Sequence, residues 1–386
     1  MKQQSEYQIV AYYCPIFHAD PRNEERHGQG WTEWELIKAA RPRFPGHRQP
    51  KVPLWGYQDE SDPAVFEQKI QTAADYGLSA FIFDWYWYNH GPFLQRALEN
   101  GFIHAGNNHR LKFALMWANH DWVHIHPASL GESPPVLFPG AAGAEAFDAL
   151  TDYVIRKYFS HPAYWTINGA PYFSVYELDT LIQGLGGMEA TTRALDAFRK
   201  KTRSAGFPDL HLNSVLQEEA ILPGETQAYS TADVPILLGF DSLTSYVWLH
   251  HCRLQSFPRV RYETLAGEAE QYWYRAREKY TLPYHPNVTL GWDASPRTCV
   301  SDAFENKGYP FMPVVVNNTP AEFKKALINA KRFLVDSSDV HKVVTINAWN
   351  EWTEGSYLEP DTEYEFEYLQ ALKDVFHHHT KEYGHD

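Results

Sequence analysis

The hydrophobic positions of this chain gather in short runs that are separated by longer polar and amphipathic stretches. Runs rich in Val, Ile, Phe, Tyr and Trp are almost continuously apolar, which is typical of strands buried on both faces of a parallel sheet. The pattern predicts eight such strands, at Gln8–Tyr13, Ala80–Trp85, Lys112–Trp117, Pro171–Tyr176, Leu210–Val215, Phe240–Ser245, Asn287–Trp292 and Lys342–Ala348.

Segments with a period of about 3.6 residues lie between these runs and predict helices. Gly77, Gly106 and Gly206 each stand just before a predicted strand, where a glycine ends a helix and lets the chain reverse. The interval 218–233 has a weaker helical pattern. The predicted helices are Pro63–Tyr76, Pro92–Ala105, Ala144–Phe159, Glu189–Ala205, Leu265–Tyr280, Ala321–Val335 and Glu363–Phe376.

Eight strand–helix units in succession predict an α/β fold, a single (β/α)8 TIM barrel rather than an open doubly wound sheet. No glycine-rich phosphate loop follows the first strand, so nucleotide-binding α/β folds lose their main support. Because no Pro/Gly/Ser-rich linker divides the chain, we expect residues 1–386 to form one domain. The first βα connection, at about 14–61, greatly exceeds the usual ~2–6 residues, and such loops lie on the C-terminal face where barrels build their active sites.

Charge and composition narrow the range of partners. The 386 residues include 48 Asp and Glu against 34 Lys and Arg, a net charge of -14, and the basic residues are scattered. Such a chain repels phosphate backbones and anionic lipid surfaces, so we expect neither a nucleic-acid nor a membrane partner. Many of the 13 Trp stand beside polar residues rather than inside apolar runs, which indicates a site lined with flat faces.

Cysteine spacing and the start of the chain bear on its compartment. Cys14, Cys252 and Cys299 form no CxxC pair, so the sequence predicts neither a disulfide framework nor a cysteine zinc site. No apolar run approaches the ~18 residues of a membrane span. The first residues lack the apolar core of a signal peptide. We therefore expect a cytoplasmic protein.

The sharpest chemical signal directly follows the eighth strand, in the segment Asn350-Glu-Trp-Thr-Glu354. Glu351 and Glu354 would lie at the mouth of the barrel among indole rings, where glycosyl transfer needs one carboxyl group to protonate the leaving oxygen and another to act as base or nucleophile. A Trp neighbour desolvates a carboxyl group and raises its pKa, while a more polar site keeps its partner ionised. A helix cap or an arginine partner is the alternative interpretation, and it accounts for one glutamate more easily than for both.

Two further polar clusters follow earlier strands. Asp84 ends the second strand and would hydrogen-bond a sugar hydroxyl or a catalytic neighbour, or else form a buried salt bridge. After the third strand, His120, Asp121, His124 and His126 have a spacing that invites comparison with metal sites. Nothing in the sequence makes that stretch helical, and solvated loop histidines are the alternative that we favour, so we expect no metal.

Aromatic residues recur at the ends of the fourth to seventh strands. Tyr and Trp offer apolar faces to the C–H surfaces of a sugar ring and keep a polar group for hydrogen bonding. Any one of them is more simply explained by packing, but recurrence at the same end of successive strands favours binding. We predict that substrate is bound by Tyr13, His18, Trp31, Glu33, His47, Asp84, Trp87, Trp117, Asn119, Tyr176, Tyr246, Trp292, Asp293, Trp349, Asn350 and Tyr357.

Several short segments, spread over most of the chain, form a specific combination. They are Ala11-Tyr-Tyr-Cys-Pro-Ile-Phe-His18, Gly30-Trp-Thr-Glu-Trp34, Phe44-Pro-Gly-His-Arg-Gln-Pro50, Trp117-Ala-Asn119, Trp349-Asn-Glu-Trp-Thr-Glu-Gly355 and Leu358-Glu-Pro360. This combination resembles the WbsX-like proteins, which belong with the glycoside hydrolase family 99-like group.

The resemblance implies a (β/α)8 barrel, a carbohydrate substrate and, from the endo-α-mannosidases of family 99, retaining hydrolysis of an α-linked glycan without a metal or other cofactor. In that scheme one carboxylate deprotonates the sugar's own 2-hydroxyl, which attacks the anomeric carbon to give a 1,2-anhydro sugar. A second carboxyl group acts as acid and then as base. Matched onto the motif, Glu351 would be the 2-hydroxyl base and Glu354 the acid/base, in place of the usual covalent glycosyl-enzyme.

The resemblance also sets limits and alternatives. Thr353 stands where the mannosidases have His, and the long first loop follows the WbsX-like branch, so mannose specificity is not carried over. That branch is often labelled glycosyltransferase because its members lie in polysaccharide gene clusters. A nucleotide-sugar transferase needs a diphosphate site, commonly Asp-x-Asp, and the sequence has none. A non-catalytic carbohydrate-binding barrel would keep the aromatic residues but has no need of paired glutamates.

Overall fold

The computed structural model describes residues 6–225 and 232–377, and its central feature is a ring of parallel strands. Neighbouring strands follow the order β12-β10-β9-β8-β4-β2-β1-β15-β13, which confirms the predicted (β/α)8 barrel. All eight predicted strands are present to within a few residues. The strands of the ring are β1 (Tyr7–Tyr13), β2 (Ala80–Tyr88), β4 (Lys112–Trp117), β8 (Ala170–Val175), β9 (His211–Val215), β10 (Ser242–Thr244), β12 (Tyr284–His285), β13 (Asn287–Thr289) and β15 (Lys342–Asn347).

The ring closes through its seventh strand, which is broken into two pieces at Pro286, and only the second piece falls within the predicted strand Asn287–Trp292. Before the break, β12 pairs with β10 and sets Tyr284 opposite Leu243. After it, β13 pairs with β15 and sets Asn287 opposite Thr345. Proline has no N–H to give to a ladder, but its carbonyl still accepts a hydrogen bond from Thr345 N at 3.0 Å. Two short segments therefore complete the barrel.

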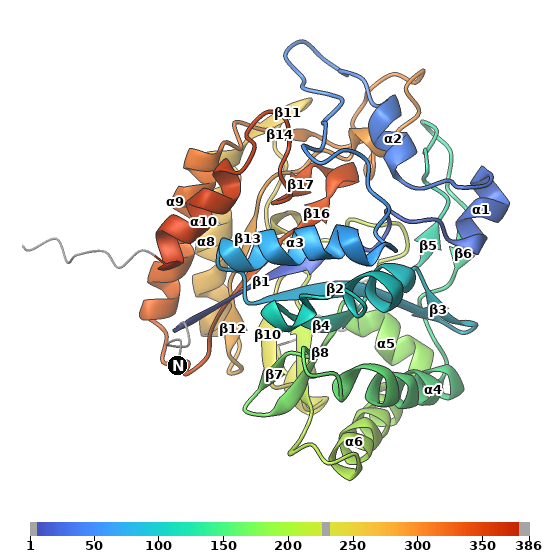
Figure 1. Cartoon of the computed structure of the whole chain (residues 1–386), viewed down its shortest axis with the longest axis vertical. Helices are drawn as coiled ribbons and strands as arrows, with labels where there is room; N and C mark the ends of the chain where they lie inside the picture. Colours follow the sequence, from blue (N-terminus) through green and yellow to red (C-terminus); the bar gives the residue numbers. More distant parts are fainter. Residues whose placement is uncertain (1–5, 226–231, 378–386) are drawn as a thin grey trace, which may run out of the picture.

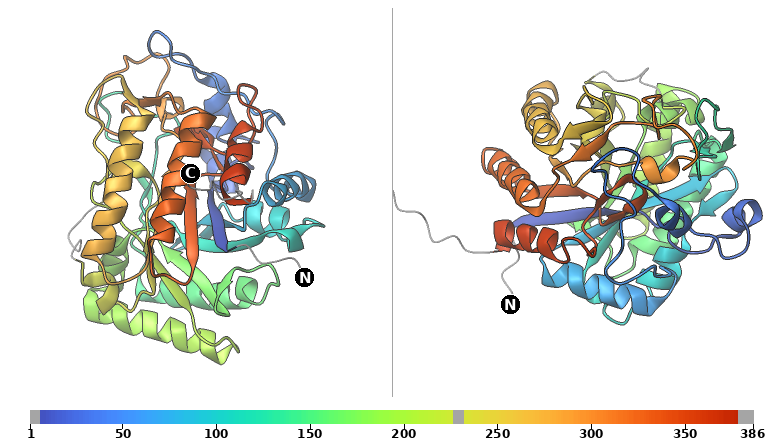
Figure 2. Two further views of the ribbon diagram at one scale, coloured as in Figure 1. Left: turned by 90° about the vertical axis from the view of Figure 1, so that its left-hand side faces the viewer. Right: turned by 90° about the horizontal axis from the view of Figure 1, so that it is seen from above.

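Helices surround the ring, as the view from above in Figure 2 shows. They bury one face and expose the other: α3, for example, begins after the Asp62 N-cap and buries Phe66 and Ile70. The helices around the barrel are α3 (Pro63–Asp75), the π-helical turn η1 (Ala97–Phe102), α4 (Ala144–Val154) continued by η3 (Ile155–Phe159), α5 (Leu178–Leu185), α6 (Met188–Ser204), α7 (Val234–Leu237), α8 (Tyr262–Lys279), α9 (Pro320–Val335) and α10 (Glu367–His377).

The predicted helix Pro92–Ala105 is wrong over its first residues, because the helical turn η1 begins only at Ala97. Gly91 adopts φ +93°, which reverses the chain so that β3 (Gly91–Phe93) pairs antiparallel with the end of β2. Helix α5 was not predicted, because the sequence reads as a loop between the fourth strand and the next helix. The weak helical pattern at 218–233 falls partly on residues 226–231, which lie outside the described residues, and 218–225 form a loop.

The long first connection contains two short helices, α1 (Pro21–His27) and α2 (Trp34–Ala39), and folds over the mouth of the barrel (Figure 1). Trp34 stacks on Phe17 with ring centroids 3.9 Å apart, and its ring lies 5.9 Å from that of Trp352. This stacking buries Trp34 and holds the first loop against the loop after the eighth strand.

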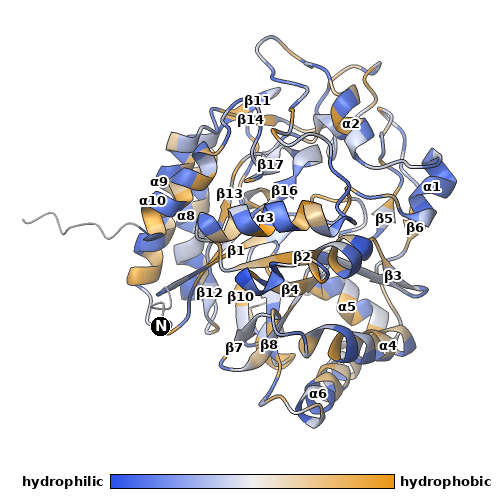
Figure 3. Ribbon diagram, in the orientation of Figure 1, coloured by the Kyte–Doolittle hydropathy of each residue, from blue (hydrophilic) through white to orange (hydrophobic). Residues whose placement is uncertain are grey.

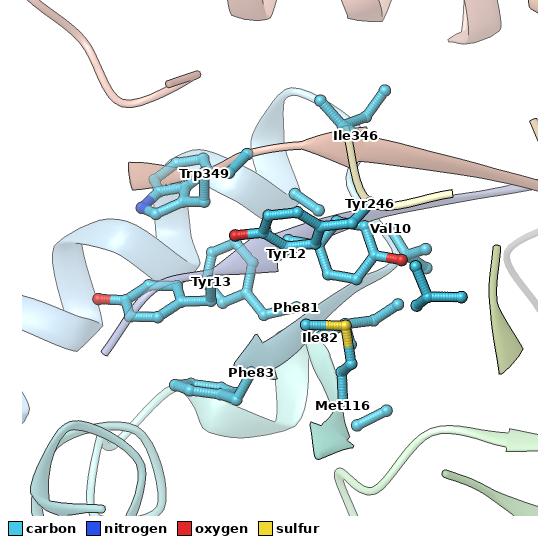
Figure 4. Close-up of a cluster of buried hydrophobic side chains, with 14 of the residues drawn as sticks. Val10, Tyr12, Tyr13, Phe81, Ile82, Phe83, Met116, Tyr246, Ile346 and Trp349 are labelled. Atoms are coloured by element: carbon cyan, nitrogen blue, oxygen red, sulfur yellow. The ribbon is translucent and has the colours of Figure 1, made fainter. Parts of the chain in front are cut away.

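Side chains alternate between the barrel axis and the helical layer along each strand. In β2, Phe83 packs toward Phe66 and Phe102 of the helical layer, whereas Asp84 lines a cavity at the axis. In β1, Tyr12 faces Tyr246 across the axis, with ring centroids 4.7 Å apart (Figure 4). Figure 3 shows the resulting pattern of hydrophobic strands inside helices that mix both colours.

Short strand pairs elaborate the loops. One of them, β7 (Thr166–Ile167), pairs with β8, and the others are β5 (Trp122–Val123) with β6 (Val136–Phe138), β11 (Arg259–Arg261) with β14 (Val314–Val316), and β16 (Asn350–Glu351) with β17 (Ser356–Tyr357). In residues 6–225 and 232–377 we find no helix with the length and continuous apolar character needed to cross a bilayer.

Candidate active site

A cavity opens where the barrel strands end, with about 740 Å³ of unfilled space including its mouth. The ends of β1, β2, β4 and β8 and the loops after β10, β13 and β15 all contribute to it. Its lining includes Cys14, Asp84, Tyr86, Met116, His120, His126, Tyr176, Tyr246, His250, Trp292, Arg297, Tyr309, Glu351 and Glu354.

The guanidinium of Arg297 organises the acidic side chains of this cavity. Its Nη1 donates to Glu354 Oε1 at 2.8 Å, while Nη2 donates to Glu351 Oε1 at 3.1 Å and to Glu33 Oε2 at 3.2 Å. These residues come from the first, seventh and eighth βα loops. One buried cation therefore holds three carboxyl groups together, in the fork geometry that suits arginine.

Two hydroxyl groups complete the shell around these carboxyl groups. Tyr309 donates to Glu354 Oε1 at 2.6 Å, and Arg297 also bonds the Tyr309 hydroxyl. Thr353 donates to Glu33 Oε2 at 2.8 Å and lies 3.3 Å from Glu351 Oε1. The carboxyl oxygens that face the guanidinium are thus fixed by several donors at once.

Asp84 lies on the side of Glu351 that faces away from Arg297, and both carboxyl groups lie near the hydroxyl of Tyr246. The Tyr246 hydroxyl is 2.8 Å from Asp84 Oδ2 and 3.4 Å from Glu351 Oε2. The second carboxyl oxygen of Asp84, Oδ1, is buried and has no hydrogen-bond partner among the residues that the structure describes. Asp84 therefore faces Glu351 and the open cavity rather than an arginine.

The four carboxyl groups of this site, which belong to Glu33, Asp84, Glu351 and Glu354, differ in pKa. Burial would raise the pKa of Glu33, but Arg297 and His126 outweigh it and lower that pKa to about 2. Burial, followed by repulsion from Glu354, raises the pKa of Glu351, and burial also raises the pKa of Glu354. Burial and then Glu351 raise the pKa of Asp84 well above its usual range.

This difference has a simple electrostatic cause. Glu33 is ionised and pairs with Arg297, and its other oxygen lies 3.1 Å from His126 Nε2. The one guanidinium cannot then neutralise Asp84, Glu351 and Glu354 as well, so burial and repulsion from neighbouring acids raise the pKa of all three. The cavity consequently combines an ionised carboxylate with carboxyl groups whose pKa is raised, an arrangement that general acid–base chemistry can use.

A second network fixes the loop that bears the two glutamates. Asn350 accepts from Cys14 N at 2.8 Å and donates to Cys14 O at 2.8 Å and to Glu60 Oε1 at 2.7 Å. The buried ammonium of Lys69 lies 2.7 Å from Glu60 and 2.8 Å from Glu359. Residue 351 is therefore anchored through Asn350, whose amide is fully used within the protein.

The turn after the second glutamate also needs a particular backbone. Gly355 adopts φ +66°, and a Cβ at this position would lie 2.8 Å from Asp293 Cβ. Asp293 N donates to Glu354 O at 2.6 Å, so the seventh loop binds the turn directly. A glycine is required here both for its backbone conformation and for this close approach.

Six of the residues predicted from the sequence to act on substrate come together in the cavity lining: Asp84, Tyr176, Tyr246, Trp292, Glu351 and Glu354. Glu33 adjoins them through Arg297 without belonging to the lining residues. His120 and His126, weighed as metal ligands, also line the cavity. His120 Nδ1 lies 2.9 Å from Asp121 O, and burial lowers the His120 pKa.

Three of the predicted residues lie toward a second hollow between the first loop and the start of α9. Asp293 accepts from Gln49 Nε2 and lies 2.7 Å from His47 Nε2. Since Arg43 N donates to His47 Nδ1, the proton of the His47 ring is on Nε2 and is donated to Asp293. His47, Asp293 and Tyr357 line this hollow, and Trp292 forms the wall between it and the cavity.

The remaining predicted residues make structural contacts and do not line the cavity. Tyr13 donates to Glu60, Asn119 bonds the backbone of Glu177, and Trp31 stacks on His27. The others bond or pack nearby: His18 to Ala19 O and Leu94 O, Trp87 to Ala146 O, Trp117 to Trp87 O, Trp349 on Phe81 and Asn350 to Cys14 and Glu60.

Sequence reasoning missed Arg297, Tyr309, Cys14, Tyr86 and His250. Cys14 and Tyr86 could have been predicted, because side chains two residues apart on a strand point to the same side. Cys14 lies two residues after Tyr12, and Tyr86 lies two residues after Asp84, so both point toward the barrel axis. Arg297 and Tyr309 lie in the loop after the seventh strand, where no sequence pattern indicates which cation or hydroxyl turns inward.

The fold is a (β/α)8 TIM barrel, and solved structures of glycoside hydrolases have similar folds. A family 99 endo-α-mannosidase from Bacteroides thetaiotaomicron has a similar structure, with a TM-score of 0.56 and 12% identity over 96% of each chain. A structure described as a glycoside hydrolase-like protein gives a TM-score of 0.62 with 14% identity over 97% of this chain and 95% of that one.

At the level of sequence, the chain belongs to the family described as Glycosyltransferase WbsX, whose model matches residues 9–372. The uncharacterised protein WxcX of Xanthomonas campestris pv. campestris is 29% identical over 368 residues. That match covers 95% of this chain and 49% of WxcX, so the chain spans about half the length of this relative.

Proposed function

We propose that the chain is a glycoside hydrolase that cleaves an α-linked glycan with retention, and that residues 1–386 form its catalytic domain. The observation that supports this most is the position of Glu351 and Glu354 on the two terminal nitrogens of one buried guanidinium, at the carboxyl end of the barrel. Two carboxyl groups held in one cavity, with protons retained among their neighbours, provide the acid and the base of glycoside cleavage.

In the proposed reaction, Glu351 removes the proton from the sugar's 2-hydroxyl, whose oxygen then attacks the anomeric carbon. Glu354 donates its proton to the leaving glycosidic oxygen, so that the bond breaks and a 1,2-anhydro sugar forms. In the second half, Glu354 deprotonates water, which opens the anhydro ring, and the 2-hydroxyl recovers its proton from Glu351. Retention results from the two successive inversions at the anomeric carbon.

The surrounding residues support these roles. Asp84 stands beside Glu351 and, in this scheme, keeps its own proton so that Glu351 can become the base. Tyr246 and Tyr176 line the cavity with hydroxyls that donate to Asp84 and Glu225, and in this scheme Trp292 offers an indole wall to the sugar. The buried His250, whose pKa burial lowers to about 3, stays neutral and can only exchange hydrogen bonds.

The leaving group separates the two glutamate roles. A panel of α-linked aryl glycosides and oligosaccharides is offered to the wild type, Glu351→Gln and Glu354→Gln, with the exposed Glu189→Gln on α6 as a control. Glu354→Gln should lose natural glycosides yet keep activity on dinitrophenyl glycosides, whose leaving group needs no acid, whereas Glu351→Gln should fail on both. Equal rates for all four proteins would refute the assignment.

A 2-deoxy substrate tests the anhydro-sugar route separately. Without the 2-hydroxyl no internal nucleophile exists, so turnover should stop although the substrate still fits the cavity. Normal turnover of a 2-deoxy glycoside would instead favour direct attack by a carboxylate, with a covalent glycosyl-enzyme.

Glycosyl transfer is the second candidate, since the family description itself names a glycosyltransferase. Its test supplies nucleotide sugars together with oligosaccharide acceptors. Formation of a longer glycan, dependent on the nucleotide sugar and absent in Glu351→Gln, would select this function over hydrolysis.

A further inference from the structure

Three side chains capable of binding a metal come together beside Arg297 and the glutamates that it holds. Cys14 follows β1, Asp84 lies in β2 and Glu351 ends β16, and all three are buried. The Cys14 sulfur and one carboxyl oxygen from each acid lie within 4.8 Å of one another. Three separate elements thus bring a thiol and two carboxyl groups to one point in the cavity.

The unpartnered oxygen of Asp84 provides an independent sign of a ligand. Asp84 is only 2% exposed, and its Oδ2 accepts from Tyr246, but within residues 6–225 and 232–377 its Oδ1 has no hydrogen-bond partner. Buried polar atoms are normally satisfied, and Asp84 lines the cavity, so Oδ1 is available to a group that enters from there.

The charges around this point also call for a cation. The guanidinium of Arg297 already donates to Glu33, Glu354 and Glu351 Oε1. The other oxygen of Glu351, Oε2, lies on the side of Tyr246 and Asp84. The groups that act electrostatically on Asp84 are the acids Glu351 and Glu354. Burial, then Glu351 and Asp84, raise the pKa of the Cys14 thiol. A positive ion at this point would relieve the repulsion among all three.

We propose that a thiophilic divalent cation such as Zn²⁺ binds Cys14 Sγ, Asp84 and Glu351 in this cavity and inhibits the enzyme by occupying Glu351. The inhibition rests on the proposed function, whereas the binding does not. Around a tetrahedral zinc ion the ligand atoms lie about 3.5 Å apart, so small inward rotations of the side chains complete the site. The fourth position faces the cavity and takes water.

The ligand set determines which ions bind. A thiolate favours Zn²⁺, Cd²⁺ and Co²⁺ over Mg²⁺ and Ca²⁺, which prefer six or more oxygen ligands. Coordination requires a thiolate and ionised carboxylates, so the thiol proton of Cys14 and the carboxyl proton of Asp84 pass into solvent. Binding should therefore release protons and strengthen as the pH rises.

Calorimetry on the full chain, freed of metal and titrated with ZnCl2, tests the site. We expect one ion per chain, with proton release seen as a dependence of the heat on the buffer's ionisation enthalpy. Cys14→Ser and Asp84→Asn should each weaken binding at least tenfold, while Cys252→Ser, a buried thiol whose sulfur faces Leu265 O, should leave it unchanged. Zinc binding of undiminished affinity in both Cys14→Ser and Asp84→Asn would overturn the proposal, as would the absence of saturable binding to the wild type.

Cobalt adds a spectroscopic readout that reports the thiolate directly. Co²⁺ bound to the wild type and to Cys252→Ser should show a sulfur-to-metal absorption band in the near ultraviolet, and Cys14→Ser should lack it. If Cys14→Ser does not fold, Asp84→Asn decides by calorimetry, because Asn keeps the shape of Asp and can still accept from Tyr246. Hydrolysis is measured separately: zinc binding without any glycosidase activity defeats the proposed function alone, and activity without zinc binding defeats the metal site alone.

Discussion

Arg297 Nη1 lies 2.8 Å from Glu354 Oε1, in an ion pair that is buried at the mouth of the barrel. The same guanidinium also reaches Glu33 of the first loop and Glu351 of the last, so three distant parts of the chain depend on one positive charge. Removing that charge leaves carboxylates buried without a partner, which costs far more than the loss of an exposed pair.

Arg297→Met should therefore lower the free energy of unfolding by about 3–5 kcal/mol and abolish hydrolysis. Denaturant unfolding measures the first effect. Arg193→Met, which removes an exposed i,i+4 partner of Glu189 on α6, is the control and should change stability by less than about 0.5 kcal/mol. Equal stability of the two variants would show that Arg297 does not neutralise the cluster.

Asn350→Asp should destabilise the chain by about 3 kcal/mol, because it removes two buried hydrogen bonds and sets a second carboxylate against Glu60. In steady-state kinetics, kcat should fall with little change in KM, since Asn350 positions Glu351 and makes no contact with the cavity. Asn329→Asp is the matched control, because Asn329 also donates to a glutamate, Glu270, but on the outer helix α9. A selective rise in KM would instead indicate that Asn350 binds substrate.

Asp84→Asn should stabilise the protein at neutral and alkaline pH. In the folded state the pKa of Asp84 is raised, so the folded chain keeps a proton that the unfolded chain releases above about pH 4. The stability of the wild type consequently falls as the pH rises from about 4 through the pKa that Asp84 has in the folded state. Asn does not titrate, so the variant lacks this loss of stability. Unfolding curves at pH 4 and pH 8 should show a gain of about 1–3 kcal/mol at pH 8 and little at pH 4. A loss of stability at pH 8 would contradict the assignment of an uncompensated acid.

Glu33→Gln should have the opposite pH dependence. Its folded pKa is lowered to about 2, so its ionised form stabilises the chain above the unfolded pKa of about 4, and that contribution is lost as the pH falls through 4 toward 2. The wild type should exceed Glu33→Gln by about 3 kcal/mol at pH 6, with the gap closing on acidification. Glu35→Gln, which changes an exposed glutamate in the first turn of α2, should follow the wild type throughout.

Most of the barrel was predictable because buried parallel strands leave an almost uninterrupted apolar signature. The positions of Gln8–Tyr13 and Lys342–Ala348 required only that signature. The break at Pro286 was not predicted, since the apolar run appeared to begin at Asn287, and the two residues before the proline are too few to register as a strand.

The candidate site was predictable in part. The alternation of side chains along each strand explains why several of the other predicted residues do not line the cavity. Asp84 and Tyr246 face the axis, whereas Tyr13, Trp87 and Trp117 point into the helical layer, where their aromatic rings pack. Attention to the two-residue repeat would have separated these groups. Arg297 is a different case: three acids require a cation, but the sequence cannot show which of 34 Lys and Arg residues turns inward.

The parallel pairing of β1 with β15 sets Tyr7 opposite Lys342 and so joins strands from opposite parts of the chain. Until β15 is synthesised, β1 has one bare edge whose N–H and C=O groups are open to any other strand. The loop with Glu351 follows β15, so the sheet closes and the ion pair between Glu351 and Arg297 forms only when this last part of the barrel is made. A growing chain is therefore at its most aggregation-prone just before its cavity exists, and chaperone demand should peak there.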